Sequence, residues 1–129
     1  MLETGKRKTS IARAVAKAGQ GRVWINDYPL DSISPEVARL KILEPMVIAG
    51  EKGKTLDIRV RVDGGGVMGQ SEAARIAVAR SLASWTKSSE LRKNFQAFDR
   101  VMLAGDQRMT EPKKFGGPGA RRRKQKSYR

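Results

Sequence analysis

A glycine loop is the first feature of this sequence whose residue types and spacing could do chemistry. Residues 64–69 read GGGVMG and satisfy the G-x-G-x-x-G spacing of dinucleotide-binding loops. A strand-like run precedes the loop and a helix-like run follows it, so backbone N–H groups at a helix N-terminus would face a bound phosphate. The spacing raises the hypothesis of an enzyme that uses a nucleotide cofactor.

The remainder of the dinucleotide-binding pattern is missing. A second strand ending in an acidic residue should follow about twenty positions later. Glu90 stands near that distance, but it lies in the polar segment KSSELRK. Two other interpretations stay open: a tight turn packed against a neighbouring element, and a backbone site for a phosphate of a polynucleotide. The residues concerned are Gly64, Gly65, Gly66, Gly69 and Gln70.

Other catalytic chemistry has few candidate residues. The chain has no Cys and no His, which excludes thiolate nucleophiles, Cys/His zinc sites and histidine acid–base catalysis. The 13 carboxylates are scattered without a defensible pair, and no serine has a histidine to activate it. We therefore expect no enzyme activity, no cofactor and no metal.

The charge of the chain points to a polyanionic partner. The 129 residues include 27 Lys or Arg and 13 Asp or Glu, which gives a net charge of +14. Nucleic acid is the first candidate for such a basic chain, and an acidic membrane surface is the second. No apolar run approaches membrane-spanning length, and the basic N-terminus lacks an apolar signal region. We expect a soluble, cytoplasmic protein that does not enter a membrane.

The positive charge is concentrated at the C-terminus. Residues 112–129 hold eight Lys or Arg and no acidic residue, together with three glycines and two prolines. Few apolar side chains are present, so this segment alone cannot bury enough surface to offset its ordering entropy. We predict a globular domain at residues 1–105 and an extended basic tail at residues 106–129.

Such a tail is typical of a nucleic-acid-binding arm. Arginine offers forked donors that match phosphate oxygens. Tyr128 offers a stacking surface that suits single-stranded or looped RNA. RNA is therefore favoured over DNA, and a DNA-compacting basic protein stays as the alternative.

The elements that must position these residues are predicted to be mixed α and β. Residues 9–18 alternate as a strand does, with Ile11 and Val15 opposite a row of alanines. The sequence GQG at 19–21 predicts a hairpin turn into a second strand at 22–26. Residues 56–63 form the clearest strand, because four aliphatic residues alternate with four charged ones.

Helices are predicted in three places. Ser34 as N-cap and Pro35 at the first position begin a helix that Pro45 breaks or kinks. A second helix covers residues 70–85 after the glycine loop, with an apolar arc to which Ile76 is an exception. Ser89 could cap a short third helix over residues 90–98.

Four separated motifs resemble one known family. They are GKRKTSIAR at 5–13, DGGG at 63–66 with GQ at 69–70 and AR at 79–80, DQRMTEPKKFG at 106–116, and ARR at 120–122 with KSYR at 126–129. In this order they are similar to the ninth protein of the small ribosomal subunit, over nearly the whole chain. The bacterial branch usually has a lysine before the last arginine. Tyr128 in that place resembles the archaeal and eukaryotic branch.

The resemblance implies a fold and a set of partners. The fold is α+β in two layers, with a small mixed sheet backed by helices, similar to the second domain of the fifth small-subunit ribosomal protein. Such a protein sits in the head of the small subunit on the 3′ domain of small-subunit ribosomal RNA, beside other head proteins. Its tail tip approaches the anticodon stem-loop of peptidyl-site transfer RNA. No homo-oligomer is expected.

Charge and resemblance together give the candidate site residues. Those assigned to ribosomal RNA are Lys6, Arg7, Lys8, Arg13, Arg75, Lys113, Lys114, Arg121, Arg122, Arg123 and Lys124. Those assigned to transfer RNA are Lys126, Tyr128 and Arg129, with Arg129 at the tip. A lysine–phosphate contact cannot be carried over to position 128, where stacking or a hydroxyl hydrogen bond is the alternative. We expect residues 113–124 to anchor the tail while residues 126–129 meet transfer RNA.

Overall fold

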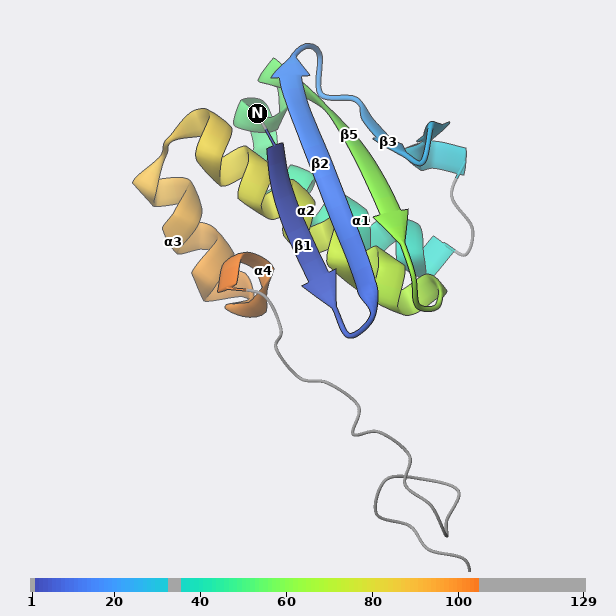
Figure 1. Ribbon diagram of the computed structural model, residues 1–129. Helices are drawn as coiled ribbons and strands as arrows, with labels where there is room; N and C mark the ends of the chain where they lie inside the picture. The colour runs from blue at the N-terminus through green and yellow to red at the C-terminus, as the bar shows by residue number, and fades with distance from the viewer. Residues whose placement is uncertain (1, 33–35, 105–129) are drawn as a thin grey trace, which may run out of the picture.

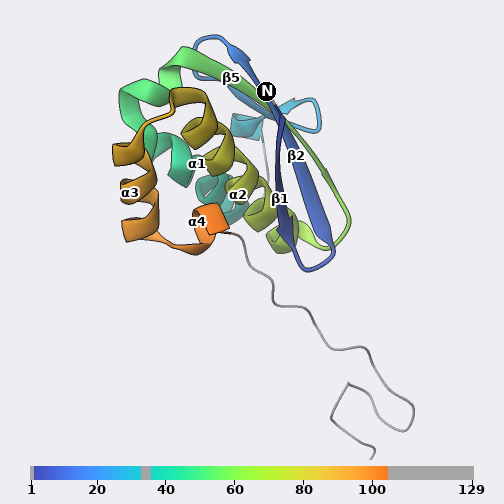
Figure 2. The same cartoon turned by 60° about the vertical axis from the view of Figure 1, so that its left-hand side comes forward.

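The structure is a computed structural model that describes residues 2–32 and 36–104. One layer is a five-stranded mixed sheet, and the helices form the second layer on one side of it (Figures 1 and 2). This confirms the predicted α+β class with a small mixed sheet backed by helices. The predicted boundary at residue 105 and the predicted tail at residues 106–129 lie outside the described residues.

The order of the strands across the sheet is β1-β2-β5-β3-β4. Strands β3 and β5 are parallel, and the other neighbours are antiparallel. The strands are β1 (Leu2–Arg7), β2 (Ser10–Ala18), β3 (Val23–Ile25), β4 (Tyr28–Pro29) and β5 (Leu56–Asp63). The helices are α1 (Glu36–Ala49), α2 (Val67–Thr86), α3 (Ser89–Phe98) and α4 (Val101–Ala104), with 3-10 turns η1 (Leu30–Ser32) and η2 (Gly50–Thr55).

The two central strands direct small and aliphatic side chains toward α2. Strand β5 has the predicted bounds, and its four aliphatic residues are buried. On β2, Ala12, Ala14 and Ala16 are at most 1% exposed, whereas Ile11 and Val15 face outward and are 40% and 37% exposed. The row of alanines therefore forms the inner face of β2. Because alanine is small, α2 packs closely against the sheet.

Gly5 allows the edge strand β1 to approach the same helix. A Cβ atom at Gly5 would lie against the carbonyl oxygen of Ala73 and 2.7 Å from the backbone nitrogen of Ala77. Both neighbours are backbone atoms of α2, which cannot move without the helix. The absence of a side chain at this position sets the distance between the strand and the helix.

Two strand predictions differ from the structure. The predicted hairpin between residues 9–18 and 22–26 is wrong, because β5 lies between β2 and β3. Strand β3 pairs in parallel with β5, with Ile25 beside Val60. Residues 2–7, which the sequence indicated only as a basic run, form β1 and pair with β2. In both places a pairing partner distant in sequence decides the structure.

The three predicted helices correspond to α1, α2 and α3, but their ends and caps differ from the prediction. Pro45 is buried inside α1 and does not end it, since the helix continues to Ala49. Helix α2 begins at Val67, three residues before the predicted start. Ile76 is buried beside the edge strand β1, where its Cβ would lie 3.1 Å from a Cβ at Gly5. Ser88 rather than Ser89 caps α3, its hydroxyl accepting a hydrogen bond from the Leu91 N–H at 3.3 Å. The predicted caps Ser34 and Pro35 lie outside the described residues.

Candidate nucleic-acid interface

The glycine loop packs against the turn between β1 and β2. Gly64 and Gly65 have φ angles of +78° and +68°, a region that favours glycine. A Cβ at Gly64 would lie 2.5 Å from the Thr9 carbonyl oxygen, and one at Gly65 would collide with the Ser10 hydroxyl. The Ser10 hydroxyl donates to the Gly64 carbonyl at 2.9 Å. This geometry supports the interpretation of the loop as a tight turn packed against a neighbouring element.

The other end of the loop is less constrained. Gly66 precedes α2 as its N-cap, and a Cβ there would meet no atom within 4 Å. Gly69 lies in the first turn of α2 near Ser10, and Gln70 donates to the Gly64 carbonyl at 3.2 Å. Within the described residues no strand follows α2, so the G-x-G-x-x-G spacing does not stand in a β-α-β unit.

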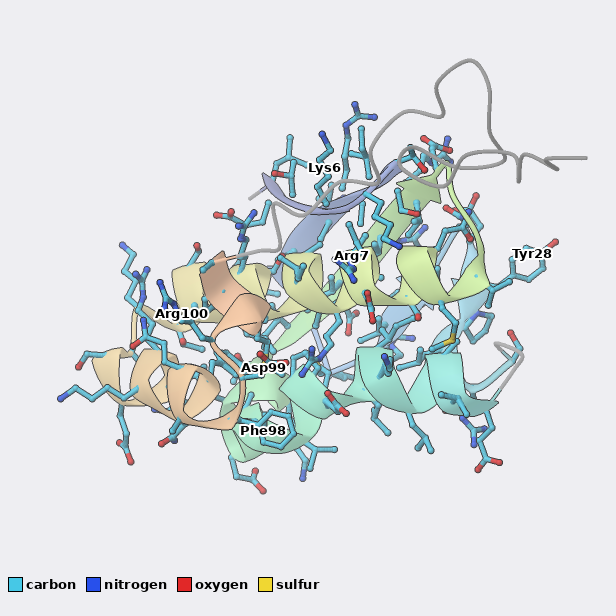
Figure 3. The ribbon with its side chains drawn as sticks, turned by 90° about the horizontal axis from the view of Figure 1, so that it is seen from below. Lys6, Arg7, Tyr28, Phe98, Asp99 and Arg100 are labelled. Carbon is cyan, nitrogen blue, oxygen red and sulfur yellow. The ribbon has the colours of Figure 1, made fainter. Side chains whose placement is uncertain are left out.

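The basic run at residues 6–8 points in two directions. Lys6 faces away from the helices, whereas Arg7 points toward them (Figure 3). Arg7 Nε donates to Glu72 Oε2 at 2.6 Å, and its side chain is only 16% exposed. Lys8 occupies the two-residue turn between β1 and β2 with a φ of +54° and is exposed. Lys6 and Lys8 are therefore the members of this run that solvent reaches.

Arg75 also binds carboxylates of its own chain. Its Nε lies 2.8 Å from Glu44 Oε2 on α1, and its Nη1 lies 3.0 Å from Asp99 Oδ2 after α3. The side chain is 12% exposed. These contacts join α1, α2 and the end of α3, which the sequence did not indicate. The contact of Arg7 and Arg75 with RNA stays a prediction.

Glu72 is the acceptor that links β1 and α1 to α2. Its carboxylate accepts hydrogen bonds from Arg7 and from Lys41 Nζ at 3.1 Å. Burial raises the pKa of the Glu72 carboxyl, but the two cationic donors lower it by more, so the pKa lies below its ordinary value. The ionised carboxylate therefore stabilises the folded chain at neutral pH.

Substitution Glu72→Gln should lower the free energy of unfolding at neutral pH by about 1 kcal/mol, because two charge-assisted hydrogen bonds are weakened. The contribution is complete above the ordinary glutamate pKa and is lost as the pH falls through the lower pKa of the folded state. Urea denaturation at successive pH values should show the variant and the native chain converging on the acid side. Glu51→Gln is the control, because that side chain is 90% exposed. A constant difference at every pH would contradict the assignment.

Arg13 leads to a surface that the sequence indicated only in part. It pairs across strands with Arg61, and Val15 pairs with Arg59, on the side of the sheet away from the helices. The charged row of β5 was evident from its alternation, but no partner was assigned to it. We call this surface the open sheet face. It comprises Ile11, Arg13, Val15, Lys17, Trp24, Arg59 and Arg61.

Two of the three carboxylates near the open sheet face, Asp57 and Asp27, have partners of their own, whereas Asp63, which pairs with Ile11 at the end of β5, forms no ion pair with described residues. Asp57 accepts hydrogen bonds from the backbone N–H groups of Arg22 and Gln20, both at 3.0 Å, and from the Arg22 side chain at 3.1 Å. These bonds, with the Arg22 N–H foremost, lower the pKa of the Asp57 carboxyl. Asp27 lies 3.6 Å from Arg61 at the rim. Among described residues, Arg13, Lys17 and Arg59 form no ion pair.

The remaining predicted site residues lie in the C-terminal segment. They are Lys113, Lys114, Arg121, Arg122, Arg123, Lys124, Lys126, Tyr128 and Arg129, all outside the described residues. In the ranges 2–32 and 36–104, no helix is long and apolar enough to cross a membrane. The same ranges contain no group of three or more carboxylates placed to hold a metal ion.

Comparisons with known proteins give one consistent result. A family model described as "Ribosomal protein S9/S16" matches residues 5–129. The chain is 57% identical over 129 residues to "Small ribosomal subunit protein uS9" of Desulfurococcus amylolyticus, covering 100% of this chain and 92% of that protein. It is 52% identical to the protein of the same name in Thermoplasma acidophilum, covering 100% of both chains. The Aeropyrum pernix protein of that name is 50% identical over 145 aligned positions, covering 100% of this chain and 96% of its own.

Proposed function

This chain belongs to the ribosomal protein S9/S16 family and is a structural constituent of the small ribosomal subunit, and from this premise we propose how its two parts act there. The body, residues 1–105, binds the 3′ domain of small-subunit ribosomal RNA and packs beside other proteins of the subunit head. The basic tail, residues 106–129, follows RNA to the peptidyl site. Its last residues contact the anticodon stem-loop of transfer RNA.

The main support for this proposal is that the family similarity extends over residues 5–129. The match continues to residue 129, so it includes the whole basic tail as well as the body. A nucleotide-dependent enzyme would require only the glycine loop, and a DNA-compacting protein would require only positive charge. Neither alternative accounts for similarity that covers the complete chain.

Charge neutralisation supplies the mechanism of the tail. Each Lys or Arg that neutralises a phosphate releases condensed counterions. Each such contact makes the slope of log affinity against log salt steeper by about 0.7 to 0.9. A segment poor in apolar residues becomes ordered when it binds RNA, because its own side chains cannot form a packed core. The anchored cations at residues 113–124 would hold the tip in place. Arg129 could then occupy one position at the decoding site.

Removal of residues 126–129 tests the role of the tip. Small subunits assembled with the shortened chain should bind peptidyl-site transfer RNA about tenfold more weakly, because charge-assisted contacts are lost. The affinity is measured by filter binding after equal incorporation of both chains has been verified.

The double substitution Lys52→Gln and Lys54→Gln is a matched control for that deletion. It also removes two positive charges, from exposed positions on η2, and should leave the affinity for transfer RNA unchanged. Equal affinity and equal reading-frame fidelity for the deletion and the control would refute a role for the tip.

A further inference from the structure

The open sheet face has the charge of an RNA-binding surface. All described helices lie on the opposite side of the sheet, so the described chain does not cover it (Figures 1 and 2). Arg13, Lys17 and Arg59 are exposed and form no ion pair with described residues. The Asp57 carboxylate is held by Arg22. Unneutralised positive charge therefore dominates the middle of this face, and it attracts a polyanion.

The same face also offers planar and apolar groups. The guanidinium carbon of Arg59 lies 4.9 Å from the centre of the Trp24 ring, and that of Arg22 lies 5.1 Å from it. Stacking on the indole holds a guanidinium flat and limits its rotation. Val15 and Ile11 on the neighbouring strand are 37% and 40% exposed. Flat arginines beside aliphatic side chains suit the faces of unpaired bases as well as phosphates.

We propose that the open sheet face binds an unpaired segment of RNA. At least one base stacks on the Trp24–Arg59 pair, and the phosphates on either side contact Arg13 and Arg61. The inference rests on the proposed function, because it assigns the ribosomal RNA contact of the body to one surface and one form of RNA. It keeps Arg13 from the sequence-based assignment and adds Trp24, Arg59 and Arg61, to which the sequence assigned no RNA contact.

Unpaired RNA fits this surface better than a duplex does. An A-form helix shows a protein mainly its phosphates and the 2′-hydroxyls of its minor groove, and these would leave the indole and aliphatic side chains without a matching group. Bases of a single strand stack on aromatic rings and on arginine planes with a gain of about 1–3 kcal/mol per base. An acidic protein segment would satisfy the cations but would not use the flat groups.

Charge removal on this face is the first test. The triple variant Arg13→Gln, Arg59→Gln, Arg61→Gln of the full chain should bind a short oligouridine at least about tenfold more weakly. Its slope of log affinity against log salt should fall by about 1.4, since the two phosphate contacts of Arg13 and Arg61 contribute about 0.7 each. The same variant should bind the 3′ domain of small-subunit ribosomal RNA more weakly. An unchanged denaturation midpoint verifies that the fold is intact.

A matched triple variant on the helical side controls for net charge. Arg39→Gln, Arg92→Gln, Arg100→Gln also removes three positive charges, from α1, from α3 and from the residue before α4. Each set contains one arginine with an exposed carboxylate partner. The control should bind within about twofold of the native chain, since it removes no proposed contact. Equal weakening by both triple variants would overturn the inference alone. Absence of any binding of the native chain to ribosomal RNA would overturn the proposed function with it.

Tryptophan fluorescence tests the stacking directly. The chain has two tryptophans, so Trp85→Phe leaves Trp24 as the only emitter. Oligouridine should quench this emission, whereas an RNA duplex of the same length should not. Arg59→Lys keeps the charge and removes the flat group, so it should abolish quenching and leave the salt slope unchanged. Equal quenching by the duplex, or displacement of the RNA by an equal concentration of polyglutamate, would overturn the assignment to unpaired RNA.

Discussion

Removal of residues 112–129 should reduce the slope of log affinity against log salt by about 4 to 5 units, measured on the isolated 3′ domain of small-subunit ribosomal RNA. The deleted segment holds eight Lys or Arg and no Asp or Glu, and six of these cations lie in residues 113–124, which are proposed to contact ribosomal RNA. Each neutralised phosphate contributes about 0.7 to 0.9 to the slope. At physiological salt the loss in affinity should reach several powers of ten, because the same contacts supply most of the binding free energy.

Two further chains make this prediction specific. A chain in which the order of residues 112–129 is shuffled keeps the charge, and its salt slope should match that of the native chain. A chain in which the eight basic residues are glutamine keeps the length, and its slope should match that of the deletion. If the deletion leaves the slope unchanged, the body alone makes the phosphate contacts, and the anchoring role of the tail is refuted.

Substitution Gly5→Ala should lower the free energy of unfolding by about 3 kcal/mol or more, at the upper end of the cost of overpacking. The added methyl group would lie against the Ala73 carbonyl and 2.7 Å from the Ala77 nitrogen. Relief requires β1 to move away from α2, which opens the contact along the whole edge strand. Since small domains are stable by only about 5–15 kcal/mol, the variant should melt at a clearly lower temperature.

Gly66→Ala is the matched control for this substitution. Gly66 has a φ of −95°, and a Cβ there would meet no atom within 4 Å. The expected change is below about 1 kcal/mol, since alanine is only a poorer N-cap than glycine. Urea denaturation of the two variants under one condition separates close packing from glycine flexibility. Similar losses for both would show that the contact between β1 and α2 does not limit the side chain at position 5.

Features with a local physical cause were predicted well. Strand β5 was placed with its correct bounds because a one-residue slip would bury four charges. The body of α2 followed from helical periodicity, although its first turn was missed. Glycine is a poor helix former. Because of Gly69, residues 67–69 were assigned to the glycine loop, although they form the first turn of α2.

Features decided by distant partners were not predictable. Strand β3 lies beside β5, more than thirty residues away in sequence, and nothing in the GQG segment distinguishes this pairing from a hairpin with β2. Arg7 and Glu72 are separated by 65 positions. Their charges alone do not indicate that one neutralises the other. For the same reason the sequence assigned Arg7 and Arg75 to RNA and gave no role to Arg59 or Trp24.

The most direct test of the central claim is a cross-link from the tail to transfer RNA. The native chain has no cysteine, so Tyr128→Cys provides a single attachment point for a short photo-cross-linker and keeps Arg129. Glu51→Cys, on an exposed side chain of η2, is the control position. In assembled small subunits with peptidyl-site transfer RNA, position 128 should cross-link to the anticodon stem-loop and position 51 should not. Cross-links from position 128 to ribosomal RNA alone, or equal yields from both positions, would contradict the account.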